Sequence, residues 1–230
     1  MCKYAVVDLE MCNVPPIKRT EQFNYSSELI QIGAVLLDEN YNKIDEFVSL
    51  VAPEFGFITP YIEKLTRISR KSLCNAPSTA QALKSFSEWL PENTIFVSWS
   101  ENDERQFRQE IEGKNISIPK LNALMDNWID CQKTFSEKMD SPKHYRLSEA
   151  LNIADICYED GAHDALVDAE NTAMLFKKME TEQEFKVSTY YSSEKKQAPL
   201  YSPFSELLKY QFAGSVSYTH LRAHETRRHL

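Results

Sequence analysis

The sequence predicts an α/β layer fold in which helices flank a central mixed sheet of five strands. Three strand-like segments come first, and helical segments then alternate with two further strands, an order typical of this class. Acidic side chains follow two of the predicted strands, where open α/β sheets place their sites. The length of 230 residues and the 42% hydrophobic content suit one globular domain with a tail.

The first three strands are expected to form an antiparallel meander. Residues 3–10 are a short apolar run that resembles a buried central strand ending in carboxylates. Side chains alternate along a strand, so Asp8 and Glu10 share one face. Residues 29–38 and 43–51 predict two more strands, and the polar segment 39–42 between them has the length of a hairpin turn.

Helices and strands alternate in the remainder of the domain. Thr59 followed by Pro60 is typical of a helix N-cap with proline at the first helical position, and Ser78 or Thr79 can cap the next helix. Apolar spacing predicts helices at 60–65, from 78 or 79 to 90, from 102, at 147–153 and at 162–179, with strands at 94–99 and 127–130.

Net charge and cysteine usage exclude several classes of function. A formal charge of −8 argues against a protein that coats nucleic acid, so a polyanion would need local basic groups or bound metal. The five scattered cysteines include no Cys-x-x-Cys pair, which argues against a disulfide framework and a zinc site. No stretch approaches the roughly 20 apolar residues of a membrane span, and no signal peptide is evident. We therefore expect a cytoplasmic protein with reduced thiols.

The C-terminal part of the chain is expected to lie outside the domain, which we assign to residues 1–180. Residues 181–214 are polar at first and then weakly amphipathic, as in a linker followed by a docking helix. Residues 215–230 resemble translated sequencing-adapter DNA, and we interpret them as a non-native tail.

Five side chains are candidates for one catalytic site. Phosphodiester hydrolysis is served by two metal ions about 3.5–4 Å apart, and magnesium prefers carboxylate oxygens as ligands. Asp8 and Glu10 provide two such ligands, Asp103 follows the fourth strand, and Asp168 lies in the last helix. His163 precedes that helix, and because histidine titrates near neutral pH it is our candidate general base.

At these residues the sequence resembles the DEDDh branch of the DnaQ-like exonuclease superfamily, over roughly residues 1–178. The likeness rests on Asp-x-Glu in VVDLEM, the aspartate of SWSENDERQF and His-x-x-x-x-Asp in HDALVDAENTAMLF. Supporting segments are IQIGAVLLD and IEKLTRIS, in which Arg67 stands where relatives commonly carry glycine. Among relatives the likeness is greatest to stand-alone exonuclease domains such as ribonuclease T.

The resemblance implies a three-layer ribonuclease-H-like fold and a 3′-to-5′ exonuclease that releases nucleoside monophosphates from single-stranded DNA or RNA. It implies two Mg²⁺ or Mn²⁺ ions per site, with Asp8, Glu10 and Asp168 on the first ion, Asp8 bridging to the second, and Asp103 acting directly or through water. It also implies substrate contacts, which we assign to Leu9, Met11, Leu65, Thr66 and Arg67.

Simpler interpretations exist for single residues. A carboxylate at a strand end is commonly a solvated side chain, and Asp103 alone could be a helix N-cap. Leu65 could fill the core, and the basic residues around it could form a solvated helix face. His144 suits an exposed loop better than a phosphate contact, and Trp99 and Trp128 suit the core. Asp164 and Glu170 are expected at the surface.

Two other functions are consistent with the same pattern. The chain could be a catalytically silent nucleic-acid-binding module, or a proofreading subunit that docks on a polymerase through residues 199–212. Association as a homodimer is a further alternative. The presence of all five side chains favours an active enzyme, because a silent module has no physical need for clustered carboxylates.

Overall fold

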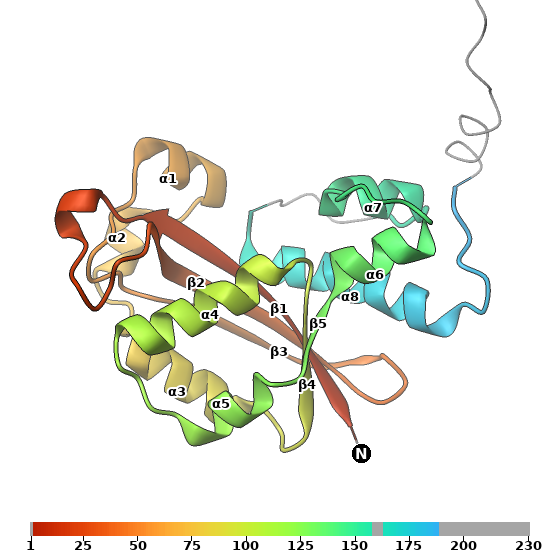
Figure 1. Cartoon of the computed structure of the whole chain (residues 1–230), viewed down its shortest axis with the longest axis horizontal. Helices are drawn as coiled ribbons and strands as arrows, with labels where there is room; N and C mark the ends of the chain where they lie inside the picture. The colour runs from red at the N-terminus through yellow and green to blue at the C-terminus, as the bar shows by residue number, and fades with distance from the viewer. Residues whose placement is uncertain (1, 158–162, 189–230) are drawn as a thin grey trace, which may run out of the picture. The chain divides into compact units, whose positions relative to one another are not determined.

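A mixed five-stranded sheet forms the centre of the computed structural model, within the residues that it describes, 2–157 and 163–188 (Figure 1). The strand order is β3-β2-β1-β4-β5. β1 pairs antiparallel with β2 and parallel with β4, which confirms the predicted class. The strands are β1 (Lys3–Asn13), β2 (Ser27–Leu37), β3 (Lys43–Leu50), β4 (Thr94–Ser98) and β5 (Trp128–Asp130).

Helices surround this sheet. They are α1 (Pro60–Thr66), α2 (Arg70–Leu73), α3 (Thr79–Trp89), α4 (Glu101–Gly113), α5 (Pro119–Leu124), α6 (Cys131–Lys138), α7 (Leu147–Ile153) and α8 (Ala165–Thr181), with a 3₁₀ turn, η1, at Pro16–Lys18. The predicted caps Thr59 and Ser78 are confirmed, and Ser78 forms a capping box with Gln81. The sequence did not predict α2, α5, α6 or η1, because segments this short carry too few turns for a clear apolar period.

Several predicted boundaries differ from the structure, and three of the differences have a clear cause. β1 does not end at Glu10 but continues to Asn13, with an irregular register between Glu10 and Met11. α4 begins at Glu101 because the Ser100 hydroxyl, and not Asp103, caps its amides. α8 begins at Ala165 because the Asp164 carboxylate accepts from the Leu166 amide.

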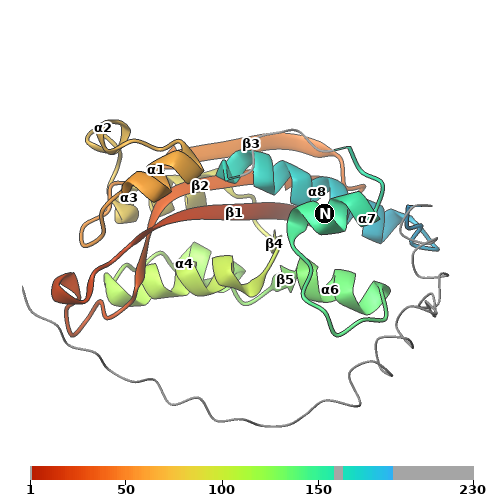
Figure 2. The same cartoon turned by 90° about the horizontal axis from the view of Figure 1, so that it is seen from above.

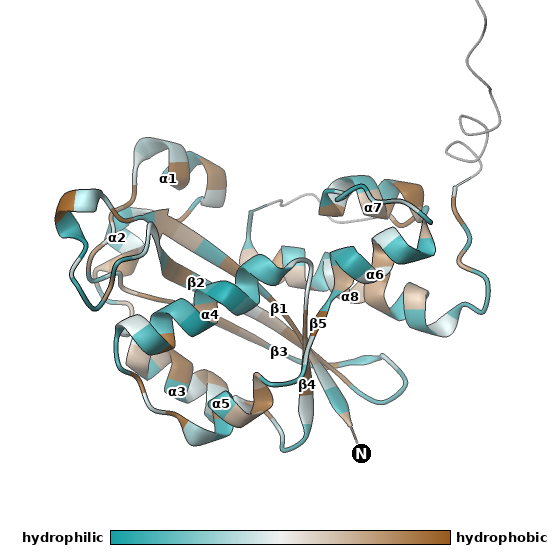
Figure 3. Ribbon diagram, in the orientation of Figure 1, coloured by the Kyte–Doolittle hydropathy of each residue, from teal (hydrophilic) through white to brown (hydrophobic). Residues whose placement is uncertain are grey.

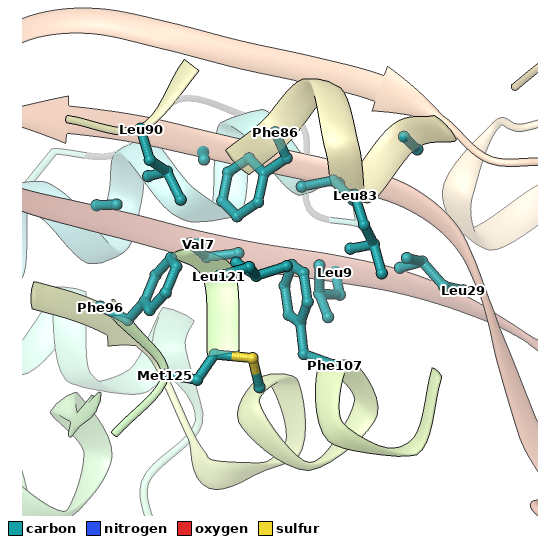
Figure 4. Packing of buried hydrophobic residues seen from close by; sticks show 14 of the residues in the cluster. Val7, Leu9, Leu29, Leu83, Phe86, Leu90, Phe96, Phe107, Leu121 and Met125 are labelled. Carbon is teal, nitrogen blue, oxygen red and sulfur yellow. The ribbon is translucent and has the colours of Figure 1, made fainter. Parts of the chain in front are cut away.

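One face of the sheet packs against α3, α4 and α5. Leu9 and Val7 of β1 meet Phe86 of α3 and Phe107 of α4 in a fully buried cluster (Figure 4). The Phe86 and Phe107 rings stack with centroids 5.6 Å apart. Burial of each large side chain contributes roughly 1.5–3 kcal/mol. Figure 3 shows the strands largely brown, whereas α4, whose outer face is exposed to solvent, is largely teal.

α8 packs along the opposite face. Tyr4 of β1 contacts Phe176 of α8, with ring centroids 5.3 Å apart. Because side chains alternate along β1, Asp8 and Glu10 belong to the face of Tyr4 and not to that of Val7. The helices therefore enclose the sheet on both sides (Figure 2). By the alternation along β1, the carboxylates lie on the α8 side.

The compact unit extends beyond residue 180, where we placed the domain boundary, and reaches Ser188. The Phe185 ring meets the Phe135 ring edge-on at 5.7 Å, and the Ser188 amide donates to the Ile153 carbonyl at 2.7 Å. These contacts anchor the segment after α8 on α6 and α7. The predicted docking helix at 199–212 and the tail at 215–230 lie outside the described residues.

Cysteine chemistry agrees with the sequence. All five cysteines are free thiols, with Cys12 and Cys131 buried.

None of the helices formed by the described residues is long and apolar enough to cross a membrane.

A buried ionic cluster ties the loop after β3 to the sheet. Glu28 of β2 accepts from the amides of Phe55 and Gly56 at 2.8 and 2.5 Å. The Lys114 ammonium lies 2.6 Å from Glu28 and 2.9 Å from Glu110, and the side chains of all three are buried. Burial alone would lower the pKa of Lys114, but the two carboxylates outweigh it and raise that pKa.

We expect Lys114→Met to destabilise the protein by about 3–5 kcal/mol, because the substitution leaves two buried carboxylates without their cation. Equilibrium unfolding in guanidinium chloride would measure the loss. Lys84→Met is the matched control: Lys84 is largely exposed, and its ion pair with Glu88 spans 3.9 Å, so the free energy of unfolding should change by less than about 1 kcal/mol. Equal losses in the two variants would contradict the prediction.

Candidate active site

The candidate site lies where β4 ends beside the middle of β1. β4 pairs with β1 from Lys3↔Thr94 to Val6↔Val97, so the parallel pairing stops just before Asp8. Asp8 and Glu10 then project on the α8 face beyond the end of β4. This position matches the expected one, at the carboxyl end of a parallel strand in an α/β sheet.

Gly33 allows α8 to approach this position closely. In the β1–β2 register Gly33 is the partner of Asp8. A Cβ atom at Gly33 would lie 2.2 Å from the backbone carbon of Ala165 and 2.3 Å from the Leu166 nitrogen. The first turn of α8 therefore rests directly on the sheet, and it carries Asp168 to the carboxylates of β1.

His163, Glu10 and Asp168 meet at this point. One ligand atom of each of the three side chains lies within 4.8 Å of the others. The His163 backbone amide donates to Asp168 Oδ2 at 2.9 Å, and the imidazole is on an exposed residue. His163 has a φ of 70°, in the left-handed region that side chains rarely adopt, and such strain is typical of functional positions.

Asp103 completes the group from α4. Its carboxylate is buried, with 6% of the residue exposed, and its Oδ1 accepts from the Leu9 amide at 3.1 Å. This hydrogen bond couples α4 to the part of β1 that lies between Asp8 and Glu10. Asp103 is thus part of the carboxylate cluster and does not cap α4.

The four carboxyl groups disfavour one another's ionisation. Burial and the neighbouring Asp103, Asp168 and Glu10 raise the pKa of Asp8 well above its ordinary value. Burial and Asp168 raise the pKa of Glu10 to about 8, and burial raises the pKa of Asp103 to about 7. Burial also raises the pKa of Asp168, against the hydrogen bond from the His163 amide.

Such a cluster fits a bound divalent cation. Buried carboxylates that repel one another are stabilised in their charged form when a cation neutralises them. Asp8, Glu10, Asp103 and Asp168 offer the hard oxygen atoms that Mg²⁺ and Mn²⁺ prefer. His163 is the nitrogen donor in the group, and no cysteine of the described chain belongs to it.

A cleft of about 820 Å³ opens over the carboxylates. Its lining includes Asp8, Glu10 and Asp168, together with the exposed His163. Tyr61 of α1 lines one part of it, and residues of α7 and of the loop before α7 line another. In Figure 1, α1 lies close to the C-terminal end of β1, and α7 lies well apart from α1.

Two of the five expected substrate contacts line this cleft, and three do not. Leu9 and Met11 are lining residues, whereas Leu65, Thr66 and Arg67 are not. Thr66 is buried, and its hydroxyl donates to the Ile62 carbonyl while it accepts from the Ile68 amide. The structure therefore gives Thr66 a role in ending α1.

Arg67 occupies a position that favours glycine. It follows α1 with a φ of 60°, the left-handed conformation that ends many helices. Glycine adopts this conformation without strain, which explains why relatives commonly carry glycine there. The Arg67 side chain is exposed.

Several residues of the site were not found by sequence reasoning. Tyr61 is 70% exposed although it lines the cleft. Asn171 also lines the cleft, is 3% exposed, and has an Oδ1 atom without a hydrogen-bond partner in the described structure. A glycine inside a strand signals close backbone approach, so Gly33 could have been identified from the sequence; Tyr61 and Asn171 carried no such signal.

The aromatic and histidine side chains divide between core and cleft. Trp128 stacks on Phe96 with centroids 4.6 Å apart and belongs to the core, as predicted. Trp99 is largely buried but also lines the cleft. His144, expected in an exposed loop, is exposed and lines the cleft as well.

Four carboxylates and a histidine at this position of a mixed, helix-flanked sheet define a nuclease of the ribonuclease-H-like class. Comparison with known proteins gives the family. The sequence matches the ribonuclease T family model, described as Exonuclease, over residues 5–176. The chain belongs to this exonuclease family, whose members are 3′-to-5′ exonucleases that depend on divalent metal.

Curated relatives agree with this assignment. The epsilon subunit of DNA polymerase III from Aquifex aeolicus is 30% identical over 196 residues, which are 82% of this chain and 87% of that protein. ERI1 exoribonuclease 2 from Danio rerio is 28% identical over 186 residues, or 70% of this chain. The aligned part is 33% of the zebrafish protein, so the chain spans about a third of that relative.

Solved structures share the fold. The nuclease domain of 3′hExo, described as a DEDDh family member bound to rAMP, superimposes with a TM-score of 0.68 at 19% identity, over 81% of this chain and 96% of that one. Cell-death related nuclease 4 gives a TM-score of 0.66 at 22% identity, over 91% of this chain and 78% of that one.

We expect Gly33→Ala to lower the exonuclease kcat by about a hundredfold, because α8 must move away from β1 and displacements near 1 Å can have effects of this size. Steady-state kinetics on a labelled oligonucleotide would measure it. Gly113→Ala is the matched control: its Cβ would meet the Phe23 ring at 2.5 Å, at the end of α4 that does not carry Asp103. A Gly33→Ala variant with normal kcat would refute the clearance argument.

Proposed function

We propose that this chain is an active exonuclease that releases nucleoside monophosphates one at a time from the 3′ end of single-stranded DNA or RNA. The observation that carries the proposal is that Asp8, Glu10, Asp168 and His163 line one cleft. Asp103 is held next to them by the hydrogen bond that it accepts from the Leu9 amide. A catalytically silent module would have no need for buried carboxylates that repel one another.

The metal ligands follow from the carboxylate cluster. Asp8, Glu10 and Asp168 would hold one divalent cation, and Asp8 would share a second, with Asp103 contributing directly or through water. The bound ions, Mg²⁺ or Mn²⁺, would supply an activated water at neutral pH and neutralise charge that develops on the phosphate. This assignment is supported by the carboxylates of Asp8, Glu10 and Asp168, which all line the cleft.

His163 would act as the general base. Its imidazole lines the cleft on an exposed residue, within 4.8 Å of Glu10 and Asp168. There it can take a proton from water and pass it to solvent, which a buried carboxylate cannot do as easily. The hydrogen bond from its own amide to Asp168 holds the backbone in place.

Met11 and Tyr61 would contact the terminal nucleotide through their side chains, whereas the Leu9 side chain is packed in the core. Apolar and aromatic side chains hold single-stranded ends by packing on the faces of the bases, which does not depend on sequence. Both sugars occur among the similar structures: one is described as bound to rAMP, and another, Escherichia coli exonuclease I, as bound to a dT13 oligonucleotide. We therefore include DNA and RNA in the proposal.

The test is an exonuclease assay with the full chain. Single-stranded DNA and RNA of equal sequence, labelled at the 5′ end, are incubated with Mg²⁺, Mn²⁺ or EDTA beside an Asp8→Ala control. We expect a ladder that shortens from the 3′ end and disappears with EDTA and in the control. Intact strands under every metal condition, from a folded protein that still binds them, would replace this proposal with a silent binding module.

A second candidate is a proofreading subunit, favoured by the likeness to the Aquifex epsilon subunit over 87% of that protein. This proposal requires a polymerase partner. Co-purification of the chain with a replicative polymerase, and preferential removal of mismatched 3′ ends in that complex, would support it. Size-exclusion chromatography with light scattering would test the remaining alternative, a homodimer.

A further inference from the structure

The α7 side of the cleft carries an unpaired cation. Arg146 is the single lysine or arginine among the residues that line the cleft in the described part of the chain. It is exposed, and no carboxylate of residues 2–157 or 163–188 forms an ion pair with it. The adjacent Lys143 is paired with Glu149, so this nearby carboxylate is already neutralised. The Arg146 guanidinium thus faces the cleft free to bind an anion.

His144 lies next to Arg146 in the same wall, and Gln132 fixes its ring. Gln132 Nε2 donates to the Tyr145 carbonyl at 2.7 Å, which turns the amide oxygen of Gln132 toward His144. His144 Nδ1 lies 3.1 Å from that oxygen and must therefore donate to it. The other ring nitrogen, Nε2, is left without a hydrogen bond in the described structure, and it can donate to a phosphate oxygen when the imidazole is protonated.

We propose that Arg146 and His144 form a subsite for a backbone phosphate of the strand upstream of the bond that is cleaved. The inference rests on the proposed exonuclease function. The carboxylate cluster, with the divalent cations proposed above, would bind the phosphate that reacts, but a chain of net charge −8 repels the phosphates farther along the strand. A free guanidinium offers a planar set of donors that matches phosphate oxygens.

The basic residues of α1 and α2 fit this role less well. Lys64, Arg67, Arg70 and Lys71 do not line the cleft. Arg70 Nε also donates to the Ile58 carbonyl at 3.0 Å, so that side chain is partly engaged within the fold. The wall formed by the loop before α7 is therefore the better site for an upstream phosphate.

The test compares two substrates that differ in the upstream phosphate. One is a single-stranded oligonucleotide; the other is the p-nitrophenyl ester of thymidine 5′-monophosphate, which contains the reacting phosphate alone. For Arg146→Met we expect kcat/KM on the oligonucleotide to fall about tenfold, mainly through KM. Activity on the ester should not change. The plot of log kcat/KM against log salt should become less steep by roughly 0.7.

Two further variants complete the test. Lys84→Met removes an equal charge from α3, outside the cleft, and should leave both activities and the salt dependence unchanged. His144→Ala should weaken the oligonucleotide reaction in the same direction as Arg146→Met. Since the exposed Arg146 side chain makes no hydrogen bond or ion pair with the described residues, thermal unfolding of Arg146→Met should match the wild type.

Each outcome decides the proposal. Loss of activity on the oligonucleotide alone supports the subsite. Equal losses on both substrates would place Arg146 at the reacting phosphate and overturn it, as would no loss on either. A wild-type protein that cleaves neither substrate would refute the exonuclease function; fluorescence anisotropy with a labelled strand would then decide separately whether Arg146 binds its backbone.

Discussion

Replacing Asp8 by asparagine is expected to lower kcat by a factor on the order of a thousand or more. Asparagine has nearly the same shape, but it is neutral. It would therefore bind the divalent cations poorly, and these cations neutralise the remaining carboxylates. Single-turnover kinetics at saturating Mg²⁺ or Mn²⁺ would measure the loss. Glu170→Gln is the matched control: Glu170 lies in α8 close to Asp168 but pairs with Lys43 outside the cleft, and it should keep full activity.

The companion variant His163→Ala distinguishes a base from a ligand. If His163 is the general base, kcat should fall about a hundredfold to ten-thousandfold while the affinity for Mn²⁺, measured by calorimetry, stays within about twofold. If His163 is instead a metal ligand, as its proximity to Glu10 and Asp168 also allows, both quantities should fall together. The second result would remove the general base from the proposed mechanism.

In the absence of metal, the protein should lose stability as the pH rises from about 5 to 8. The folded-state pKa of Glu10 is raised from 4.5 to about 8, and that of Asp103 from 3.8 to about 7. Between these limits the folded state binds more protons than the unfolded state. Its stability is therefore complete below the unfolded pKa and declines through the folded pKa, by up to about 1.4 kcal/mol per pH unit for each proton.

Divalent cations should reverse this loss. At pH 8 added Mg²⁺ or Mn²⁺ replaces the protons, so the Tm should rise by several degrees, whereas at pH 5 the rise should be small. Thermal unfolding with EDTA and with metal, across this pH range, would show both effects. A Glu10→Gln Asp103→Asn double variant should have a flatter pH profile and little response to metal. A wild-type profile that is flat with EDTA would contradict the raised pKa values.

The parts of the fold that depend on local sequence could be predicted. The period of two placed Asp8 and Glu10 on one face of β1, and the cap residues Thr59 and Ser78 marked two helix starts. The polar segment 39–42 closed the β2–β3 hairpin as expected. These features are encoded within a few neighbouring residues, where periodicity and capping preferences operate.

The contacts that assemble the site could not be predicted in this way. Leu65 and Thr66 were assigned to the substrate from the sequence pattern around them. The turn at Arg67 and the packing of α1 instead place Tyr61 in the cleft and leave Leu65 and Thr66 outside it. Asp103 was predicted as a site residue, with a helix N-cap as the alternative, but its hydrogen bond from the Leu9 amide, across 94 positions of the chain, could not be read from the sequence. Such placements depend on how distant elements pack, and no local pattern reports them.

The proposed metal-binding and proton-transfer groups of the site differ in how firmly the chain holds them. Asp8 belongs to β1, where it pairs with Gly33 of β2 and the next amide, of Leu9, donates to the buried Asp103, so we expect backbone amides around it to exchange with solvent only on global unfolding. The His163 amide has one hydrogen bond, to Asp168, on an exposed and strained residue. We expect it to exchange through local opening. Mild heating would then move His163 out of the site while the carboxylates stay in place. The enzyme would still bind metal normally but would turn over slowly, and its activity would recover on cooling.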